Sequence, residues 1–511
     1  MNLQTSRHPL NLYKRRENLR VMRRELAFLI VIVLIGGILR IVDLGTESLW
    51  NDEILSVDHA SQPTAADVVE HVKNREAAPP GHYLVLHYWI LLFGDADFSV
   101  RLLSVLFSVA SIVLLYIVTR LYFSERTALI AALLFATSMS QVLYAQEARL
   151  YSMFTFLVLM TTYFFFRGFM VRTHILHRVL YVVALIAALY TNYLAVVVIV
   201  FYGFLLLWNR RATLRWMMLT ACALLLSAPL AFIVADQFAR ANGGLSEVLL
   251  SYGVPQAIAG LGLFVFAMPS VLFCLMLGGM ILLRNKMRSW LILPNWCFVV
   301  LVVVFCFVYA YLSLYPLSLL SVPVFRVPIT NSYFLIRHSL FLAPLLYVLA
   351  AWKITSLDRK YVAVVLGMIL VTQAFSLGVF YTTITKPDWK GAMAFVERQS
   401  GYEMHPLMLL DRGGGSNTLL LERYYSDADV VDLTLYSSRS EFYQIPDDIL
   451  IEKVRGRSFW LVLSKNHGTG DYYKDLLDKN FERSFSGEIY GVNVYQYRSL
   501  TIDNLKYAGS S

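Results

Sequence analysis

Charge is scarce in this sequence of 511 residues, because 58% of them are hydrophobic and only 15% are charged. Soluble globular proteins carry about 25% charged residues, so this composition excludes a soluble enzyme and indicates many membrane-spanning helices. The net charge of +9 does not point to nucleic acid, since Lys and Arg are concentrated in short loops between apolar segments. That distribution is the positive-inside pattern of membrane proteins.

Cysteine is also rare, with 4 residues that all lie inside apolar segments. Their spacing matches no structural metal site, so Cys222, Cys274, Cys297 and Cys306 are interpreted as small buried side chains. The glycines at 413–415 lack the Lys-Ser/Thr of a P-loop and the spacing of a dinucleotide site, and they indicate a turn. No small-residue cleavage site follows the first apolar segment, so we expect a retained helix rather than a signal peptide.

The apolar segments and basic loops together predict about eleven spans, with the N-terminus in the cytoplasm and the C-terminus outside. A basic arm, residues 1–25, precedes a first span from Leu26 to Leu44. The segment from Tyr83 to Phe93 is too short to cross about 30 Å of hydrocarbon, so we predict a helix lying at the outer surface. The predicted core is thus a polytopic α-helical membrane domain, residues 26–385, with a large first external loop, residues 45–97.

The composition becomes polar after Thr385, where Lys386 and Pro387 end the last helix. The remaining stretch alternates between short strand patterns and helical patterns, which predicts a small extracytoplasmic α/β domain at 386–511. The expected strands are 407–410, 430–433, 459–463, 481–485 and 492–497, and the expected helices include 392–398 and 418–425. We expect this domain to cover the mouth of an active site or to select an acceptor.

Two adjacent carboxylates, Asp52 and Glu53, follow Trp50 in the first external loop. Charge beside a membrane is costly and tends to mark a functional site. The alternative is structural, because Asn51, Asp52 and Glu53 also suit the first turn of a helix.

The predicted topology places polar side chains from distant parts of the chain in one outer layer. A carboxylate there can deprotonate an attacking hydroxyl, while arginines hold phosphate oxygens. Structural alternatives exist, since Arg149 can pair with Glu147 and Arg337 can anchor a span. The layer contains Asp52, Glu53, Asp58, His59, Glu76, His82, Arg101, Glu147, Arg149, Tyr151, Asn192, Tyr193, Arg337 and His338.

Four short motifs resemble those of the membrane glycosyltransferases of the C superfamily: Trp50–Glu53, Ala78–Tyr83, Arg101–Ser104 and Gln146–Tyr151. The chain is similar to family 39, the bacterial relatives of protein O-mannosyltransferases and of the lipid A aminoarabinose transferase. The resemblance covers roughly the first 400 residues. One departure is that Ala77 and Ala78 stand before Pro79, where the family often has a charged residue.

The resemblance implies an inverting transfer of a sugar from a polyprenyl-phosphate donor, of undecaprenyl type, at the outer face of a bacterial inner membrane. It favours Asp52 as the base, and successive side chains of a helix point about 100° apart, so Glu53 would hold the loop or pair with Arg149. Arg149 would bind the donor phosphate, with Arg337 as a second contact and Arg101 as a structural alternative. The expected substrate-binding residues are His82, Glu147, Tyr151, Tyr193 and His338.

No cofactor is predicted, and a divalent cation at Asp52 and Glu53 is left open. The acceptor, a hydroxyl on a glycolipid, lipopolysaccharide, polysaccharide or protein, is also left open. Two other functions remain: a transporter or flippase of polyprenyl-linked glycans, and a non-catalytic subunit of a cell-envelope complex. The sequence shows no repeated halves of the kind common in transporters.

Overall fold

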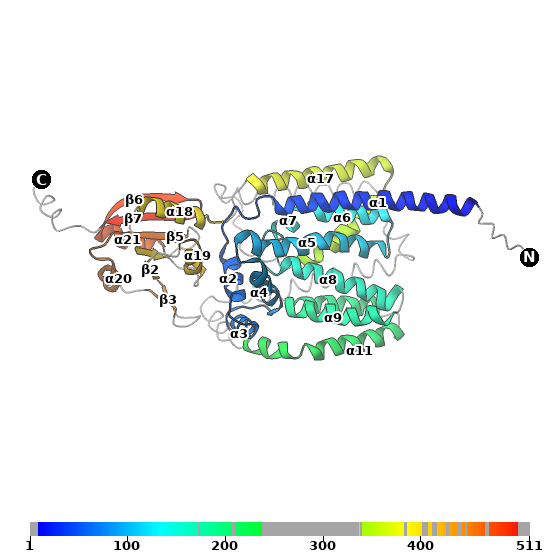
Figure 1. Cartoon of the computed structure of the whole chain (residues 1–511), viewed down its shortest axis with the longest axis horizontal. Helices are drawn as coiled ribbons and strands as arrows, with labels where there is room; N and C mark the ends of the chain where they lie inside the picture. The colour runs from blue at the N-terminus through cyan, green and yellow to red at the C-terminus, as the bar shows by residue number, and fades with distance from the viewer. Residues whose placement is uncertain are drawn as a thin grey trace, which may run out of the picture.

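The computed structural model describes residues 9–171, 174–206, 210–237, 337, 340–382, 386–400, 407–410, 416–425, 429–432, 434–436, 442–444, 447–464 and 470–498. A long helical bundle carries a smaller unit with a β-sheet at one end, and the N-terminus lies at the other end (Figure 1). The short helices α2, α3 and α4 lie between these two parts. The elements between bundle and sheet therefore come from the predicted first external loop.

The bundle and the short helices at its end together make up the part of the chain before the sheet unit. Its described elements are α1 (Pro9–Ile41), α2 (Asn51–Ala60), α3 (Ala65–Arg75), α4 (Gly81–Phe93), α5 (Asp97–Arg120), α6 (Glu125–Thr137), α7 (Met139–Leu143), α8 (Tyr151–Phe165), η1 (Phe166–Val171), α9 (Ile175–Thr191), α10 (Ala195–Leu206), α11 (Arg210–Leu226), η3 (Leu340–Leu342), α16 (Ala343–Thr355) and α17 (Arg359–Thr382).

The first helix is longer than predicted. We expected a polar arm before a span beginning at Leu26, but α1 is continuous from Pro9 to Ile41. The arm is rich in Arg, Leu, Glu and Met, which have high helix propensity, so the basic segment simply extends the helix.

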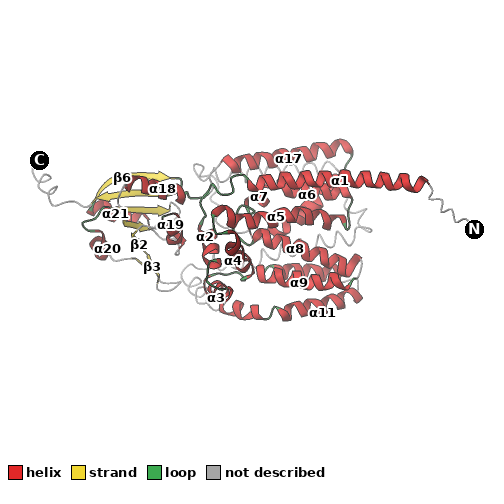
Figure 2. Cartoon of the chain, viewed as in Figure 1, coloured by secondary structure: helices red, strands yellow, loops and turns green. Residues whose placement is uncertain are grey.

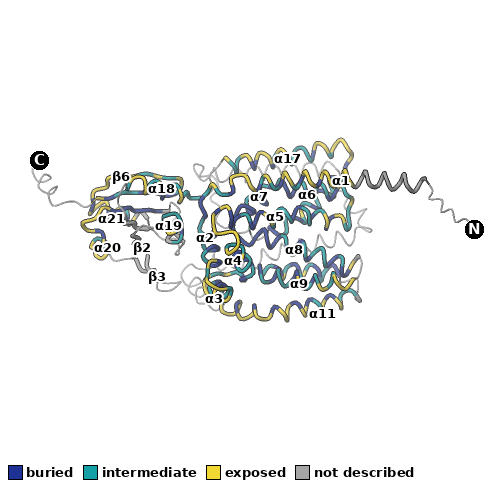
Figure 3. The backbone as a smooth tube through the Cα atoms, viewed as in Figure 1, coloured by how far each residue is buried: buried dark blue, intermediate teal, exposed yellow. Residues whose placement is uncertain are grey.

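Three described helices are long and apolar enough to cross a membrane, or four if the pair 212–226 and 229–237, bent by 64°, counts as one span. Helices such as α11 and α17 present exposed apolar side chains along their outer faces, including Leu225 and Val371 (Figure 3). This pattern fits a multi-pass membrane protein whose outer helix faces contact lipid. The count of about eleven spans and the sidedness stay predictions, because residues 238–336 lie outside the described part.

Helix α4 has 13 residues, about two thirds of the ~20 that a perpendicular span requires. Its last residues, Leu91, Leu92 and Phe93, are at least 60% exposed. Both features fit the predicted surface helix. Its first residue must be glycine, since a Cβ at Gly81 would lie 2.5 Å from the carbonyl oxygen of Tyr190 at the end of α9. The Pro-Pro-Gly sequence thus lets α4 begin in contact with the bundle.

The C-terminal unit contains a five-stranded sheet of order β2-β1-β5-β7-β6 (Figure 2). Strand β1 pairs in parallel with β2 and β5, whereas β7 pairs antiparallel with β5 and β6. Each expected strand corresponds to one of these, so the local patterns were read correctly. The elements are α18 (Trp389–Ser400), β1 (Leu407–Leu410), α19 (Ser416–Tyr424), β2 (Asp429–Asp432), β3 (Thr434–Tyr436), β4 (Phe442–Gln444), α20 (Asp447–Val454), β5 (Phe459–Ser464), α21 (Gly470–Asn480), β6 (Glu482–Ile489) and β7 (Val492–Arg498).

The C-terminal unit packs directly on α2. Leu49 and Ile54 share a buried apolar cluster with Leu420, Leu421 and Trp460. Polar contacts reinforce the apolar ones at the edge of this cluster. Arg423 forms an ion pair with Asp97 at 2.9 Å. The Tyr424 hydroxyl accepts a hydrogen bond from the Leu49 amide and donates one to Asp97. The sheet unit therefore helps to position the loop that carries Asp52 and Glu53.

One cysteine prediction is wrong. Cys222 lies exposed on α11 rather than in a protein core, because this helix lies at the edge of the bundle. The other cysteines, Cys274, Cys297 and Cys306, and the 413–415 glycines lie outside the described residues.

Candidate functional site

Helix α2 begins where the sequence places its acidic pair. The Trp50 amide donates to Glu53 Oε2 at 3.3 Å, which caps the first turn. Asp52 and Glu53 both lie in that turn, where the helix dipole favours negative charge. The structural interpretation of the pair, a helix start, is therefore correct, but it does not describe what each carboxylate contacts.

Glu53 is fully buried and every oxygen has a cationic or N–H partner. Arg101 donates to both oxygens at 2.8 Å, Lys386 approaches Oε2 at 2.9 Å, and the Ala148 amide donates to Oε1 at 2.9 Å. Burial raises the pKa of Glu53, but Lys386 and Arg101 outweigh it and lower the pKa to about 2. Glu53 is thus a charged structural centre rather than a base. Of the two alternatives predicted for Glu53, pairing with Arg149 is wrong because Arg101 occupies that place, whereas holding the loop agrees with the contacts that Arg101 makes to Glu53 and to the loop carbonyls.

All N–H groups of Arg101 are used by Glu53 and by the loop around it. Besides Glu53, its guanidinium donates to the carbonyl oxygens of Leu44, Glu47 and Ser48 at 2.8–3.0 Å. An arginine side chain has five N–H donors, and these contacts use all of them. Arg101 therefore has no free N–H group for the phosphate of a lipid-linked sugar, and its predicted structural role is the one that the geometry supports.

Asp52 faces a different environment. Its side chain is 27% exposed, and Oδ2 accepts from Arg337 at 2.6 Å. Its main-chain carbonyl accepts from Arg149 at 3.1 Å. Neighbouring side chains on a helix diverge by about 100°, so the acidic pair separates into a buried carboxylate and an accessible one.

Arg149 lies behind Asp52, almost completely buried. Its Nη1 contacts Ser56 Oγ at 3.0 Å, the Tyr83 hydroxyl at 3.4 Å and Glu76 Oε2 at 3.5 Å. Within the described residues, its Nε has no hydrogen-bond partner. Arg149 pairs with Glu76. The structural alternative predicted for it, an ion pair with Glu147, is not present in the described part of the chain. It retains N–H groups that a phosphate could bind.

Glu147 and Tyr151 border the same space. Burial raises the pKa of Glu147 to about 7. The charge of Lys386 opposes this rise, and repulsion from Glu53 and Asp52 adds to it. Glu147 Oε2 has no hydrogen-bond partner within the described residues. Tyr151 is buried and close enough to Arg149 to interact with its charge.

The remaining expected residues divide into three cases. His82 is buried beside Arg149, and burial together with that charge lowers the pKa of His82 to about 3, so it is neutral. Tyr193 donates to Gln237 at 2.8 Å, and Gln237 donates to the Ala78 carbonyl, so Tyr193 supports the first loop. His338 lies outside the described residues.

Sequence reasoning missed the role of Lys386, which it treated only as a helix breaker. It also missed that Glu76, Ser56 and Tyr83 surround Arg149. Tyr83 stands in one of the quoted motifs, which is the signal that could have identified it. No local pattern connects Lys386 with a residue so early in the chain.

A divalent cation shared by Asp52 and Glu53 is not favoured by this geometry. Glu53 is engaged by Arg101 and Lys386, whereas Asp52 pairs with Arg337. The two carboxylates therefore have different partners, and a shared cation stays a prediction.

Residues 77–235 match the family model described as dolichyl-phosphate-mannose-protein mannosyltransferase. A search of curated proteins gives no match. Among solved structures, ArnT from Cupriavidus metallidurans in the apo state matches with a TM-score of 0.52 and 15% identity, over 92% of this chain and 98% of that one. The same protein bound to undecaprenyl phosphate matches with a TM-score of 0.51, 15% identity and the same coverage.

The oligosaccharyltransferase of Archaeoglobus fulgidus matches with a TM-score of 0.48 and 14% identity, over 92% of this chain and 72% of that one. The matched region of the family model contains the Ala78–Tyr83, Arg101–Ser104 and Gln146–Tyr151 motifs. The chain therefore has the fold of ArnT, and its residues 77–235 match the mannosyltransferase family model.

Proposed function

We propose that this protein is an inverting glycosyltransferase that moves a sugar from a polyprenyl-phosphate donor to a hydroxyl group of an extracytoplasmic acceptor. The observation that carries the proposal is the partly exposed Asp52 carboxylate, 2.6 Å from Arg337, with the buried Arg149 behind it. A base and two arginines in contact suit the transfer of a group away from phosphate.

The proposed reaction is a single displacement. The acceptor oxygen attacks the anomeric carbon as Asp52 takes its proton, and the bond between that carbon and the phosphate oxygen breaks. The leaving polyprenyl phosphate gains one negative charge. Arg149 and Arg337 stabilise this charge because a planar guanidinium pairs with two phosphate oxygens at once.

Arg337 has a second task in this proposal. Before the donor binds, it pairs with Asp52 Oδ2. A donor phosphate competes for Arg337 and draws it away, which leaves the Asp52 carboxylate available to the acceptor. The base would then be available to the acceptor only when the donor is present.

The donor class is supported by the relatives, since ArnT has been captured with undecaprenyl phosphate and the matching family is described by its dolichyl-phosphate-mannose donor. We propose undecaprenyl phosphate as the carrier, in a bacterial inner membrane. His82, Glu147 and Tyr151 would contact the sugar. The sheet unit, packed on α2, would select the acceptor.

The test is sugar transfer from synthetic polyprenyl-phosphate sugars by the full-length protein in detergent, with glycolipids, polysaccharides and peptides screened as acceptors. Wild type should release polyprenyl phosphate and form one product with inverted anomeric configuration. Asp52→Asn should bind the donor lipid but not turn it over. Absence of transfer with every donor, in protein that binds none of them, would contradict the proposal.

A further inference from the structure

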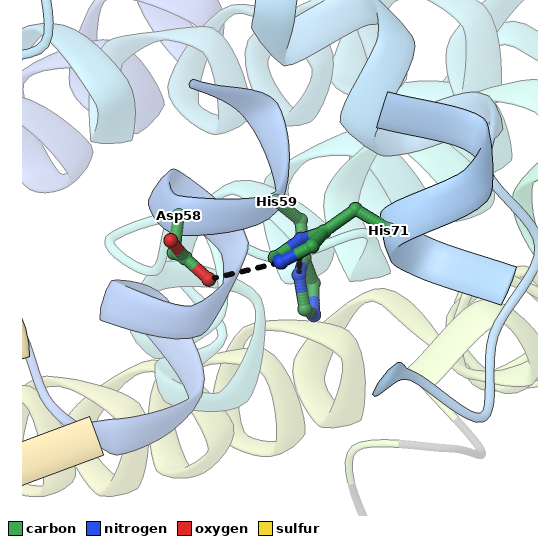
Figure 4. A group of neighbouring side chains, drawn as sticks. All are labelled: Asp58, His59 and His71. Atoms are coloured by element: carbon green, nitrogen blue, oxygen red, sulfur yellow. Dashed lines mark hydrogen bonds and ion pairs between the residues drawn. The ribbon is translucent and has the colours of Figure 1, made fainter. Parts of the chain in front are cut away.

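A cluster of imidazole and carboxylate groups joins α2 to α3 on the far side of His59 from the reaction centre (Figure 4). Asp58 and His59 come from α2, and His71 comes from α3. His59 Nδ1 lies 3.0 Å from His71 Nδ1, and His71 Nε2 lies 3.8 Å from Asp58 Oδ2. One ligand atom from each of the three residues falls within 4.8 Å of the others. No part of the proposed transfer uses this cluster.

The ring nitrogens of the cluster face one another in a way that suits a bound cation. His59 Nε2 faces Glu76 Oε2 at 3.7 Å, and a carboxylate there favours the tautomer with the proton on Nε2. That tautomer turns the Nδ1 lone pair of His59 toward Nδ1 of His71. The other nitrogen of His71 already faces the Asp58 carboxylate. The two Nδ1 atoms, 3.0 Å apart, can share either a proton or a metal ion.

We infer that Asp58, His59 and His71 bind a divalent transition metal of the zinc class. Two nitrogen ligands exclude Mg²⁺ and Ca²⁺, which take oxygen ligands, whereas zinc binds His and Asp. Two nitrogens bound tetrahedrally to zinc lie about 3.3 Å apart, close to the separation of the two histidines. The Asp58 and His71 side chains are 21% and 18% exposed, which leaves a side open for water as a fourth ligand.

Glu76 gives this site the second shell that metal-bound histidines usually have. A ligating imidazole commonly donates its other N–H to a carboxylate, and Glu76 stands in that position behind His59. The same Glu76 oxygen lies 3.5 Å from Arg149 Nη1. His59 also packs edge-on against Tyr83, with ring centroids 5.3 Å apart. The metal would therefore fasten α3 to α2 and, through Glu76, hold Arg149 in place.

The role of this metal is structural and positioning, and the inference does not depend on which group the enzyme transfers. Metal content is measured on the purified full chain without a polyhistidine tag. After dialysis against zinc and then against metal-free buffer, wild type should retain about one zinc ion per chain. Adding ZnCl₂ to chelator-treated protein should raise the Tm, whereas MgCl₂ or CaCl₂ should not.

His71→Ala and Asp58→Asn alter partly exposed ligands, so both variants should fold, and each should lower zinc affinity at least about 100-fold by isothermal titration. Glu76→Gln should lower it about 10–100-fold through the second shell. Glu70→Gln is the matched control, because Glu70 precedes His71 on α3, is 61% exposed and is not a ligand. Wild type that retains no zinc and shows no Tm shift overturns the inference, as do ligand variants that bind zinc as tightly as the control.

Discussion

The adjacent residues Asp52 and Glu53 show how differently two carboxylate groups are used in this protein. Glu53 is buried and contacts Arg101, Lys386 and a backbone amide. Asp52 is partly open, and within the described residues its carboxylate has one cationic partner, Arg337. A carboxylate whose oxygens are all engaged stabilises the fold, whereas one with an accessible oxygen can accept a proton from a substrate. Adjacency in sequence therefore says little about shared function.

The arginines show the same division. Arg101 donates all of its N–H groups to Glu53 and to main-chain carbonyl oxygens. Arg149 is equally enclosed but keeps an Nε without a partner in the described part of the chain. Buried donors without partners are costly, so their presence at one arginine and not at the other marks where a ligand belongs.

The largest effect should come from Asp52→Asn. The variant keeps the shape of the side chain but removes its basicity, so the transfer rate should fall about 10²–10⁴-fold. Donor affinity and Tm should stay near wild type, because Asp52 is partly exposed and not part of the buried centre. Single-turnover kinetics and thermal unfolding check this. A large drop in Tm with a normal rate would remove the distinction between the two acids.

Glu53→Gln should have the opposite signature. Arg101 and Lys386 would be left as buried charges without a counter-charge, which costs about 3–5 kcal/mol of stability. Chemical unfolding in detergent measures this, with the exposed Glu70→Gln as control. Residual folded protein should still bind the donor. Wild-type stability together with complete loss of turnover would instead make Glu53 the base.

Glu147→Gln should change how the stability of the protein depends on pH. The pKa of Glu147 is raised to about 7, so the folded state binds more protons than the unfolded state between about pH 4.5 and 7, and stability falls as pH rises through this window. Gln carries no such proton. The variant should be more stable than wild type at pH 8, by up to about 3 kcal/mol, and show little difference at pH 4.5. Parallel Tm profiles from pH 4.5 to 8 would contradict this.

Arg149→Lys should have the smallest of these effects. The charge remains but the two-pronged contact with phosphate is lost, so donor affinity should weaken about tenfold. Direct titration with the donor lipid measures it. Arg101→Lys serves as contrast, because it should lower Tm while leaving the affinity of the folded fraction unchanged. Equal loss of donor affinity in both variants would show that the phosphate reaches Arg101 as well.

Local patterns predicted the elements that depend on local forces. The helix start at Trp50–Glu53 follows from its polar and acidic first turn, and the strand at Leu407–Leu410 from a short apolar run. Both lie where expected. The motifs also selected Asp52 and Arg149 as neighbours.

What the sequence could not provide was the partner of each charge. Glu53 and Lys386 are 333 positions apart, and nothing in either segment identifies the other. Arg101 stands in a recognisable motif, but its five hydrogen bonds depend on how the loop from Leu44 to Ser48 folds around it. Likewise, the Asp58, His59 and His71 cluster arises only when α3 folds back on α2.

The contact between Glu53 and Lys386 also has a consequence for how the chain is made. Ribosomes add about 5–20 residues per second, so the 333 residues between the two take roughly 20–70 seconds to synthesise. During that interval Glu53 can pair with Arg101 but not with Lys386, and the sheet unit that packs on α2 has not been synthesised. The contacts of Glu53 are therefore completed only after Lys386 has been translated, so a ribosome that stalls before Lys386 leaves Glu53 without this charge partner.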